Sequence, residues 1–89
     1  MAKRRTYEVR LLVTARHQLL RIPVRIRLRI ASAIRALAAD PRPPGCKKLV
    51  GSTDYFRIRV GDYRVLYEVR DRDILVLVIK IGHRREVYR

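Results

Sequence analysis

Residues 55–69 alternate apolar and charged side chains in two runs, which the dipeptide Gly61-Asp62 separates. Such alternation is typical of β-strands with one buried face. A glycine in the first position of a two-residue connection is typical of a type II′ turn between antiparallel strands. The segment therefore predicts a β-hairpin, and the turn sets its register so that Arg59 pairs with Arg64.

The predicted hairpin has two chemically different faces, because side chains alternate along each strand and paired residues share a face. The face expected to enter the core carries Phe56, Ile58, Val60, Tyr63, Val65, Tyr67 and Val69. The opposite face carries Tyr55, Arg57, Arg59, Arg64, Leu66 and Glu68. Guanidinium groups this close repel one another unless an anion or a carboxylate lies among them. This face is either a solvated surface or a receptor for phosphate, which a guanidinium binds with two parallel hydrogen bonds.

The overall charge favours an anionic partner. The chain has 22 Lys and Arg residues against 8 Asp and Glu residues, for a net charge of +14. Such a field attracts nucleic acid, an acidic protein or an anionic membrane surface. A coding bias toward arginine would explain the Arg to Lys ratio but not the scarcity of acids. Nucleic acid or an acidic protein is therefore the expected partner.

Other classes of protein are disfavoured by length and composition. Residues 1–89 suit one domain, and a hydrophobic content of 48% is ample for a folded core. Cys46 is the single cysteine and the two histidines, His17 and His83, are far apart, so no disulfide and no metal site are expected. No apolar run approaches about 18 residues and the basic N-terminus leads to no apolar signal core, so we expect a cytoplasmic protein without a membrane span.

The first half of the chain predicts one strand and two helices. Residues 7–13 are typical of a strand, and the Thr14 hydroxyl is a candidate N-cap for a helix over 15–21. Pro23 suits the first turn of a second helix. Segment 40–45, rich in proline and glycine, ends that helix. Three- and four-residue spacing marks the buried stripe of the second helix: Ile26, Ile30, Ala33, Ile34 and Leu37.

A last strand is expected over 74–81, with two possible registers. A two-residue loop before it would bury Lys80, which is costly for an unpaired ammonium group. A three-residue loop places Lys80 beside Arg64, and we expect this register. It directs four side chains to the core: Leu75, Leu77, Ile79 and Ile81.

Together these elements predict an α+β fold of order β-α-α-β-β-β. The sheet is expected to be twisted and mainly antiparallel. Two helices should pack on one of its faces, which leaves the basic residues on the other.

The hairpin over 55–69, followed by Gly82-His83-Arg84 and Tyr88, resembles toxins of the RelE/ParE superfamily. The Leu-x-x-Ile-Pro run at 19–23, Asp40-Pro41-Arg42 and Lys47-Lys48-Leu49 are also typical of these toxins, so the resemblance covers nearly the whole chain. It implies the toxin half of a toxin–antitoxin pair. RelE-like members cut messenger RNA in the ribosomal decoding site without a cofactor, and an acidic antitoxin restrains them.

The resemblance also implies roles for individual residues. Arg57 and Arg59 stand where RelE-like toxins have catalytic or RNA-contacting lysines, and Arg64 matches the arginine that holds the scissile phosphate. Arg84 matches the C-terminal catalytic arginine, or Arg85 if the gap falls differently. Tyr88 matches a tyrosine that stacks on a base and assists the chemistry. Further contacts to RNA are expected from Lys47, Lys48, Tyr55, Lys80 and Arg85.

Arginine at positions 57 and 59 removes a group that could exchange a proton, because a guanidinium stays protonated near neutral pH. The remaining proton carriers nearby are His83, Tyr88, Glu86 and Glu68. His83 has the most suitable ordinary pKa, about 6.5. The alternative reading of His83 is an exposed turn residue.

Three functions are compatible with the sequence. The first is a metal-independent, ribosome-dependent endoribonuclease whose partners are messenger RNA, the ribosome and an acidic antitoxin. The second is a non-catalytic inhibitor of DNA gyrase, as in the ParE branch. The third is a plain basic RNA-binding module. The set Arg57, Arg64, Arg84 and Tyr88 favours the ribonuclease, since simple binding does not need that combination.

Overall fold

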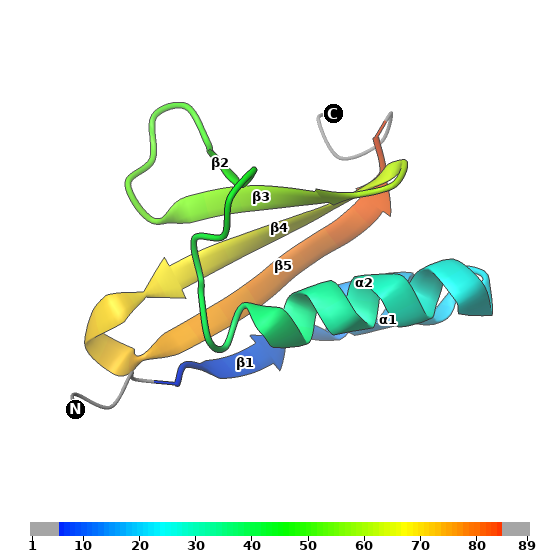
Figure 1. The fold of residues 1–89 in the computed structure, drawn as a ribbon, viewed down its shortest axis with the longest axis horizontal. Helices are drawn as coiled ribbons and strands as arrows, with labels where there is room; N and C mark the ends of the chain where they lie inside the picture. Colours follow the sequence, from blue (N-terminus) through cyan, green and yellow to red (C-terminus); the bar gives the residue numbers. More distant parts are fainter. Residues whose placement is uncertain (1–5, 85–89) are drawn as a thin grey trace.

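The computed structural model describes residues 6–84 as a five-stranded sheet covered on one face by two helices (Figure 1). The strands lie in the order β1-β5-β4-β3-β2, with β1 parallel to β5 and the other neighbours antiparallel. Within the described residues no helix is long and apolar enough to cross a membrane. In chain order the elements are β1 (Glu8–Leu11), α1 (Val13–Leu20), α2 (Val24–Ala36), β2 (Lys47–Lys48), β3 (Tyr55–Val60), β4 (Tyr63–Arg70), the 3₁₀ turn η1 (Asp71–Asp73) and β5 (Leu75–His83). The predicted α+β fold class is confirmed.

The predicted hairpin is confirmed pair by pair in β3 and β4. Gly61 has a φ of 59°, as the first position of a type II′ turn requires, and Arg59 pairs with Arg64. The predicted core face is buried or half-buried along its whole length, from Phe56 to Val69. The turn thus separates the apolar and basic faces as expected.

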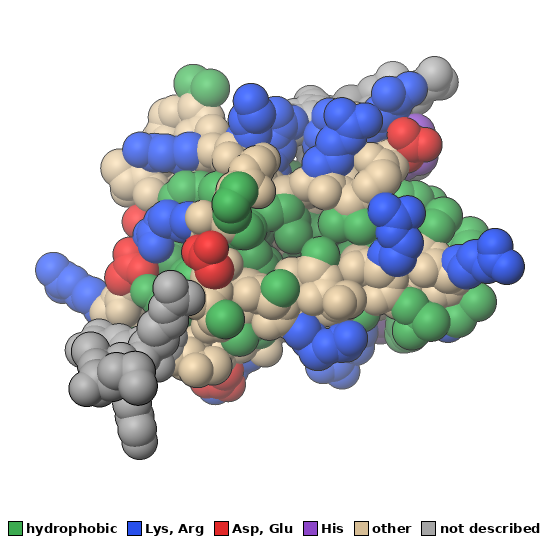
Figure 2. All heavy atoms as spheres, in the orientation of Figure 1, with side chains coloured by type: hydrophobic (Ala, Val, Ile, Leu, Met, Phe, Trp, Pro, Cys, Tyr) green, Lys and Arg blue, Asp and Glu red, His purple; other side chains and the backbone are tan. Residues whose placement is uncertain are grey.

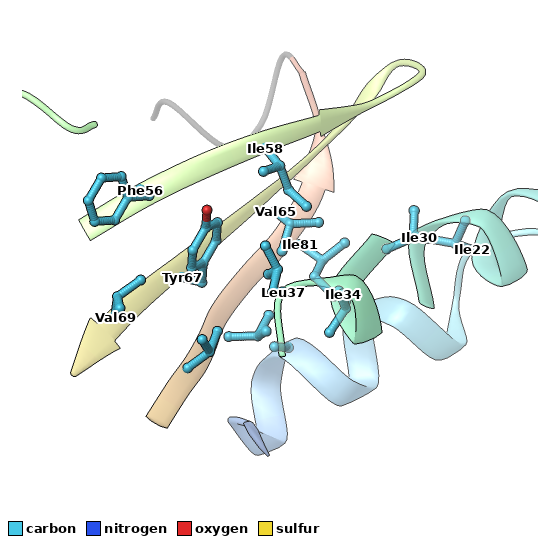
Figure 3. Packing of buried hydrophobic residues seen from close by; sticks show 13 residues of the cluster. Ile22, Ile30, Ile34, Leu37, Phe56, Ile58, Val65, Tyr67, Val69 and Ile81 are labelled. Carbon is cyan, nitrogen blue, oxygen red and sulfur yellow. The ribbon is translucent and has the colours of Figure 1, made fainter. Parts of the chain in front are cut away.

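The core lies between the sheet and the helices (Figure 3). Of the predicted stripe of α2 and its C-terminal end, Ile30, Ile34 and Leu37 are buried, while Ile26 and Ala33 pack partly buried against them. Burial of apolar side chains contributes about 25 cal/mol per Å² of surface removed from water. Because the helices bury apolar side chains on one side of the sheet only, the charged residues lie on the other side.

The predicted register of the last strand is wrong over most of its length. Val76 and Val78 enter the core, where Leu75 and Leu77 were expected. The first half of β5 therefore has the pairing that the two-residue loop would give. A β-bulge then changes the pairing: Val78 is opposite Tyr67 and Lys80 is opposite Leu66, so Ile79 is the extra residue. Beyond the bulge, Ile81 is buried as predicted.

The bulge keeps Lys80 out of the core. Lys80 lies opposite Leu66 on the basic face rather than beside Arg64, whose partner is Gly82. Burial of an unpaired ammonium group would be costly, and an extra residue in one strand removes that cost by turning the following side chains over. The expectation that Lys80 stays out of the core therefore holds, although the register behind it does not.

Three local expectations in the rest of the chain also differ. Thr14 is not an N-cap, because α1 starts at Val13 and its capping residue Leu12 makes no side-chain bond. Pro23 is the residue before α2 rather than part of its first turn. The edge strand β2 was not predicted, because two lysines carry no alternating pattern.

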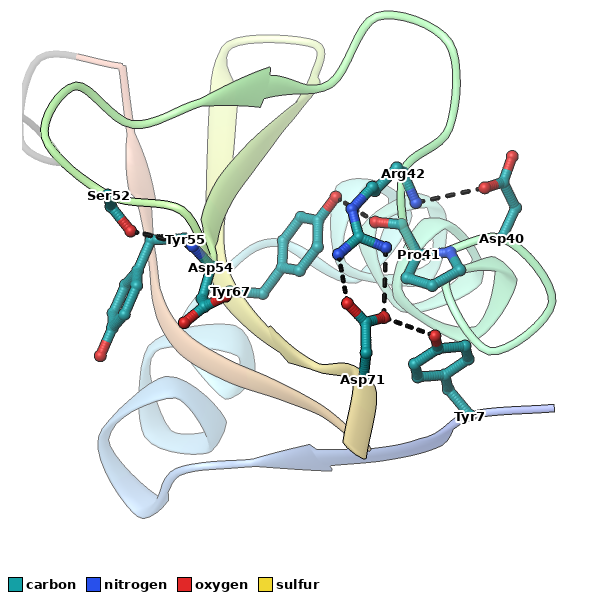
Figure 4. A network of polar contacts seen from close by, with 9 residues as sticks. All are labelled: Tyr7, Asp40, Pro41, Arg42, Ser52, Asp54, Tyr55, Tyr67 and Asp71. Atoms are coloured by element: carbon teal, nitrogen blue, oxygen red, sulfur yellow. Dashed lines mark hydrogen bonds and ion pairs between the residues drawn. The ribbon is translucent and has the colours of Figure 1, made fainter. Parts of the chain in front are cut away.

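A polar network at the end of the sheet joins three segments that are distant in sequence (Figure 4). The Arg42 guanidinium donates to both carboxylate oxygens of Asp71, at 2.8 and 3.3 Å, and the Tyr7 hydroxyl donates to Asp71 at 2.6 Å. Arg42 also lies over the Phe56 ring, 5.1 Å from its centroid. The Tyr67 hydroxyl donates to the Pro41 carbonyl at 2.7 Å, and burial raises the pKa of this phenol. The loop after α2 is thereby tied to β1 and to η1.

Asp71→Asn should remove a pH-dependent part of the stability. Hydrogen bonds from Arg42 and then Tyr7 lower the pKa of Asp71 below its ordinary value. The stabilisation is therefore complete above about pH 4 and is lost as pH falls through the lowered pKa. Because Asp71 is half exposed, we expect a loss of about 0.2–1 kcal/mol at neutral pH, which disappears in acid. Thermal unfolding of both proteins as a function of pH measures this.

Asp73→Asn is the matched control, since it removes the same charge from the same turn. A difference between Asp71→Asn and wild type that persists unchanged in acid would contradict the role of the carboxylate.

Candidate functional site

Four cations from three strands surround one hollow on the basic face of the sheet. Figure 2 shows Lys and Arg side chains gathered over β2 and the β3–β4 hairpin. The hollow measures about 120 Å³ and is lined by Gly45, Lys47, Arg57, Arg59 and Arg64. The pairs Lys47 with Arg57 and Arg59 with Arg64 lie directly across the strands from one another. The predicted arginine cluster therefore exists, with Lys47 beside it.

Arg64 occupies the middle of this group and is half-buried. Its Nη1 donates to the carbonyl oxygen of Arg84 at 3.3 Å. Removal from water lowers the pKa of Arg64, and the charges of Arg57, Arg59 and Arg84 lower it further. Gly82, its partner on β5, adds no side chain at that position. Arg64 is thus held in place where positive charge is most concentrated.

The hairpin turn holds the neighbouring groups. Arg59 donates from Nε to the carbonyl oxygen of Gly61 at 3.0 Å, which fixes its stem along the turn. The backbone N–H of Arg84 donates to the carbonyl oxygen of Asp62 at 2.8 Å. The end of β5 is therefore tied to the turn, and Arg84 comes close to Arg64.

Gln18 on α1 holds β5 in position, and the sequence offered no sign of this. β1 pairs with β5 only as far as Val78. Beyond that point the Gln18 side-chain oxygen accepts the Ile81 N–H at 2.8 Å. The amide thus replaces a strand partner for a partly buried N–H, which is costly to leave unsatisfied. Only the tertiary packing of α1 places a glutamine there.

The structure separates His83 from the arginine hollow. His83 pairs with Tyr63 across the strands, and the two rings meet edge to face at 5.7 Å between centroids. Tyr63 belongs to the face that packs toward the helices, whereas Arg64 belongs to the other face. His83 therefore faces the helices, away from the group it was expected to serve.

The other predicted RNA contacts are spread over a wider area. Tyr55 lies at the far end of the basic face, opposite Glu68, and Lys80 lies on that face opposite Leu66. Lys48 pairs with Phe56 and so lies on the side of the sheet opposite Lys47. Arg85 and Tyr88 lie outside the described residues.

Glu68 is an acid on the basic face, and Arg70 donates to it at 3.0 Å. Among residues 6–84, no group of three or more His, Cys, Asp or Glu side chains could hold a metal ion. Three of the four cations that line the hollow are arginines, which can bind and stabilise an anion but stay protonated near neutral pH.

Known proteins share the fold and part of the sequence of this chain. The family model described as the ParE toxin of type II toxin–antitoxin systems matches residues 9–88. Toxin RelG of Mycobacterium tuberculosis is 33% identical over 93% of this chain and 97% of its own length. The RelBE2 toxin–antitoxin complex of the same organism contains a similar chain, with 31% identity, a TM-score of 0.78, and coverage of 97% of this chain and 100% of that one. The RelE–RelB complex of Pyrococcus horikoshii gives 29% identity, a TM-score of 0.81, and coverage of 92% and 99%.

Gln18→Ala should destabilise the protein by about 1–2 kcal/mol, because the Ile81 N–H loses its acceptor. Arg16→Ala is the control, since it truncates an exposed side chain two positions earlier in α1, and arginine and glutamine have similar helix propensities. Urea unfolding of both variants measures the difference. Equal stability of the two variants would show that the Gln18 bond contributes nothing.

Proposed function

This chain belongs to the ParE toxin family of type II toxin–antitoxin systems, and we propose that it is a metal-independent endoribonuclease that cleaves messenger RNA in the ribosomal A site. The observation that carries the proposal is the hollow in which Lys47, Arg57, Arg59 and Arg64 converge. Four cations placed around one small hollow suit a phosphate group that gains charge during reaction. Its site of action would be the cytoplasm.

The proposed reaction uses the nucleophile of the RNA itself. The 2′-hydroxyl attacks the adjacent phosphorus atom, loses its proton, and forms a 2′,3′-cyclic phosphate. The bond to the 5′-oxygen of the next nucleotide breaks, and that oxygen gains a proton. The protein must align the attack and stabilise the phosphorane, tasks that suit Arg64 with Arg57 and Arg84.

Two proton transfers remain, and arginine cannot carry out ordinary base catalysis near neutral pH. Imidazole is the usual proton carrier near neutral pH, but His83 lies on the helix-facing side of the sheet. We therefore assign proton transfer to Tyr88, in keeping with the resemblance to RelE-like toxins.

The proposed regulator is an acidic antitoxin. Similar chains have been solved in complex with antitoxins, as RelBE2 and as RelE–RelB. A net charge of +14 favours a partner rich in acidic residues. Carboxylates of such a partner could relieve the repulsion among Arg57, Arg59 and Arg64 and so block the site against RNA.

A second candidate function is inhibition of DNA gyrase without catalysis, because the matched family is that of ParE toxins. Primer extension on messenger RNA from cells that express the chain distinguishes the two. Discrete cuts within reading frames support the ribonuclease, whereas DNA damage without cuts supports the gyrase inhibitor.

Arg64→Ala should lower the cleavage rate by about two to three orders of magnitude, the size expected when one preorganised charge donor is lost. The fold should persist, because removal of one like charge offsets the lost packing of the arginine stem. Cleavage of messenger RNA on ribosomes and thermal unfolding measure the two effects. Arg35→Ala, which removes an exposed arginine of α2, should leave the rate unchanged. A folded Arg64→Ala protein with full toxicity would refute the proposed role of the hollow.

Tyr88→Phe should reduce cleavage more than His83→Gln does, if the hydroxyl transfers a proton. The pH–rate profile of His83→Gln should keep the shape of the wild-type profile. Loss of an inflection of the wild-type profile in that variant would instead assign the proton transfer to His83.

A further inference from the structure

Two adjoining cavities open on the side of the strand ends that faces the helices. One measures about 320 Å³ and is lined by Ile26, Arg29, Gly61, Asp62, Tyr63 and His83. The other measures about 490 Å³ and shares Tyr63 and His83 with the first, adding Gln18, Arg21 and Ile22 among others. Both volumes fall within the range of about 300–1,000 Å³ that is usual for ligand sites. We call the two cavities together the Tyr63–His83 groove.

The groove combines ring surfaces with cations. Tyr63 and His83 meet at 77° between their planes, and each ring borders both cavities. Arg29 borders one cavity and Arg21 the other. Arg29 reaches from α2 to the hairpin turn, since its Nη1 lies 3.9 Å from where a Cβ of Gly61 would stand. Asp62 is a carboxylate among the lining residues, and its charge lies at the turn beside Arg29.

The groove lies at the same strand ends as Arg64 and Arg84, on the opposite side of the sheet. Tyr63 directly precedes Arg64 in β4, and His83 directly precedes Arg84 at the end of β5. Successive side chains of a strand point to opposite faces, about 3.3 Å apart along the chain. A polynucleotide that passed from Arg64 and Arg84 around the strand ends would therefore meet Tyr63 and His83.

Single-stranded nucleic acid is bound by this combination of features, with cations along the backbone and aromatic rings against the bases. We propose that the Tyr63–His83 groove is a second nucleotide subsite for single-stranded RNA. A base lies against the two rings, and the adjoining phosphates lie at Arg29 and Arg21. This inference rests on the proposed function, since it extends the same RNA beyond the cleavage site.

An acidic amphipathic peptide is the other conceivable occupant, and the structure favours a different surface for it. Leu20, Val24 and Leu28 are exposed on the helical hairpin, at 57–63% of their surface, yet line neither cavity. An amphipathic helix binds through its apolar face, for which exposed apolar side chains of this kind are suited. The groove instead offers separated rings and guanidinium groups, which suit nucleotides.

The test uses 2′-O-methyl RNA, which lacks the nucleophile and cannot be cut. The double variant Arg21→Gln/Arg29→Gln is compared with Arg16→Gln/Arg35→Gln, which removes the same charge from exposed arginines outside the groove. Affinity is measured for a dinucleotide and for an oligonucleotide of about nine residues over a range of salt concentrations. His83→Ala, checked for folding by circular dichroism, tests the ring.

The groove variant should bind the longer RNA at least about tenfold more weakly. The slope of log affinity against log salt concentration should be smaller in magnitude by about 1.4, which is about 0.7 for each of the two lost phosphate contacts. Its affinity for the dinucleotide, and that of the control variant for either RNA, should change less than about twofold. His83→Ala should weaken binding of the longer RNA by about fivefold to a hundredfold, the size of one lost stacking contact.

Equal behaviour of the groove and control variants, with wild type still binding RNA, would overturn the subsite while leaving the proposed function intact. Groove variants that keep RNA affinity but lose affinity for a poly-glutamate peptide would likewise overturn the RNA subsite. They would indicate that the groove binds an acidic protein. A wild-type protein that neither binds nor cuts RNA would instead refute the proposed function.

Discussion

The structure depends on the two-residue turn at Gly61. A φ of 59° is open to glycine at little cost and closes the hairpin without a bulge, so every pair from Val60 and Tyr63 onward is set by it. A slip of one residue would exchange the faces and place the arginines in the core. The same register sets Arg59 opposite Arg64, an arrangement of like charges that does not stabilise the sheet by itself.

The basic face is therefore maintained by the packing on its other side. Val65 and Tyr67, which flank Leu66 in β4, are fully buried in the core, and their burial outweighs the repulsion across the sheet. A charge cluster held by a core in this way is preorganised, since its members do not need to be brought together when an anion arrives. Preorganisation of this kind is how a protein stabilises charge that develops during a reaction.

The C-terminal end of β5 needs hydrogen-bond partners that β1 does not supply. β1 stops at Leu11, so the end of β5 would be an open edge beside the site. Gln18 from α1 and the carbonyl of Asp62 accept the backbone N–H groups of Ile81 and Arg84 on either side of this segment. The bulge at Ile79 lets the same strand bury Val78 and Ile81 while Lys80 stays out of the core. These contacts set the position of Gly82, His83 and Arg84 relative to Arg64.

The sequence by itself determined the hairpin, its two faces and the arginine cluster, because a glycine turn and a two-residue period act over short distances and leave one register. It also determined the buried stripe of α2, whose 3.6-residue period is local. Only the tertiary structure decided the bulge in β5, the pairing of Lys47 beside Arg57, the amide of Gln18 on Ile81, and the side of the sheet that His83 faces. Each of these depends on which surfaces meet across long stretches of chain: the last strand must match β1, β4 and α1 at once. The sequence analysis avoided a buried lysine by its choice of loop, whereas the structure avoids it by a single extra residue within the strand.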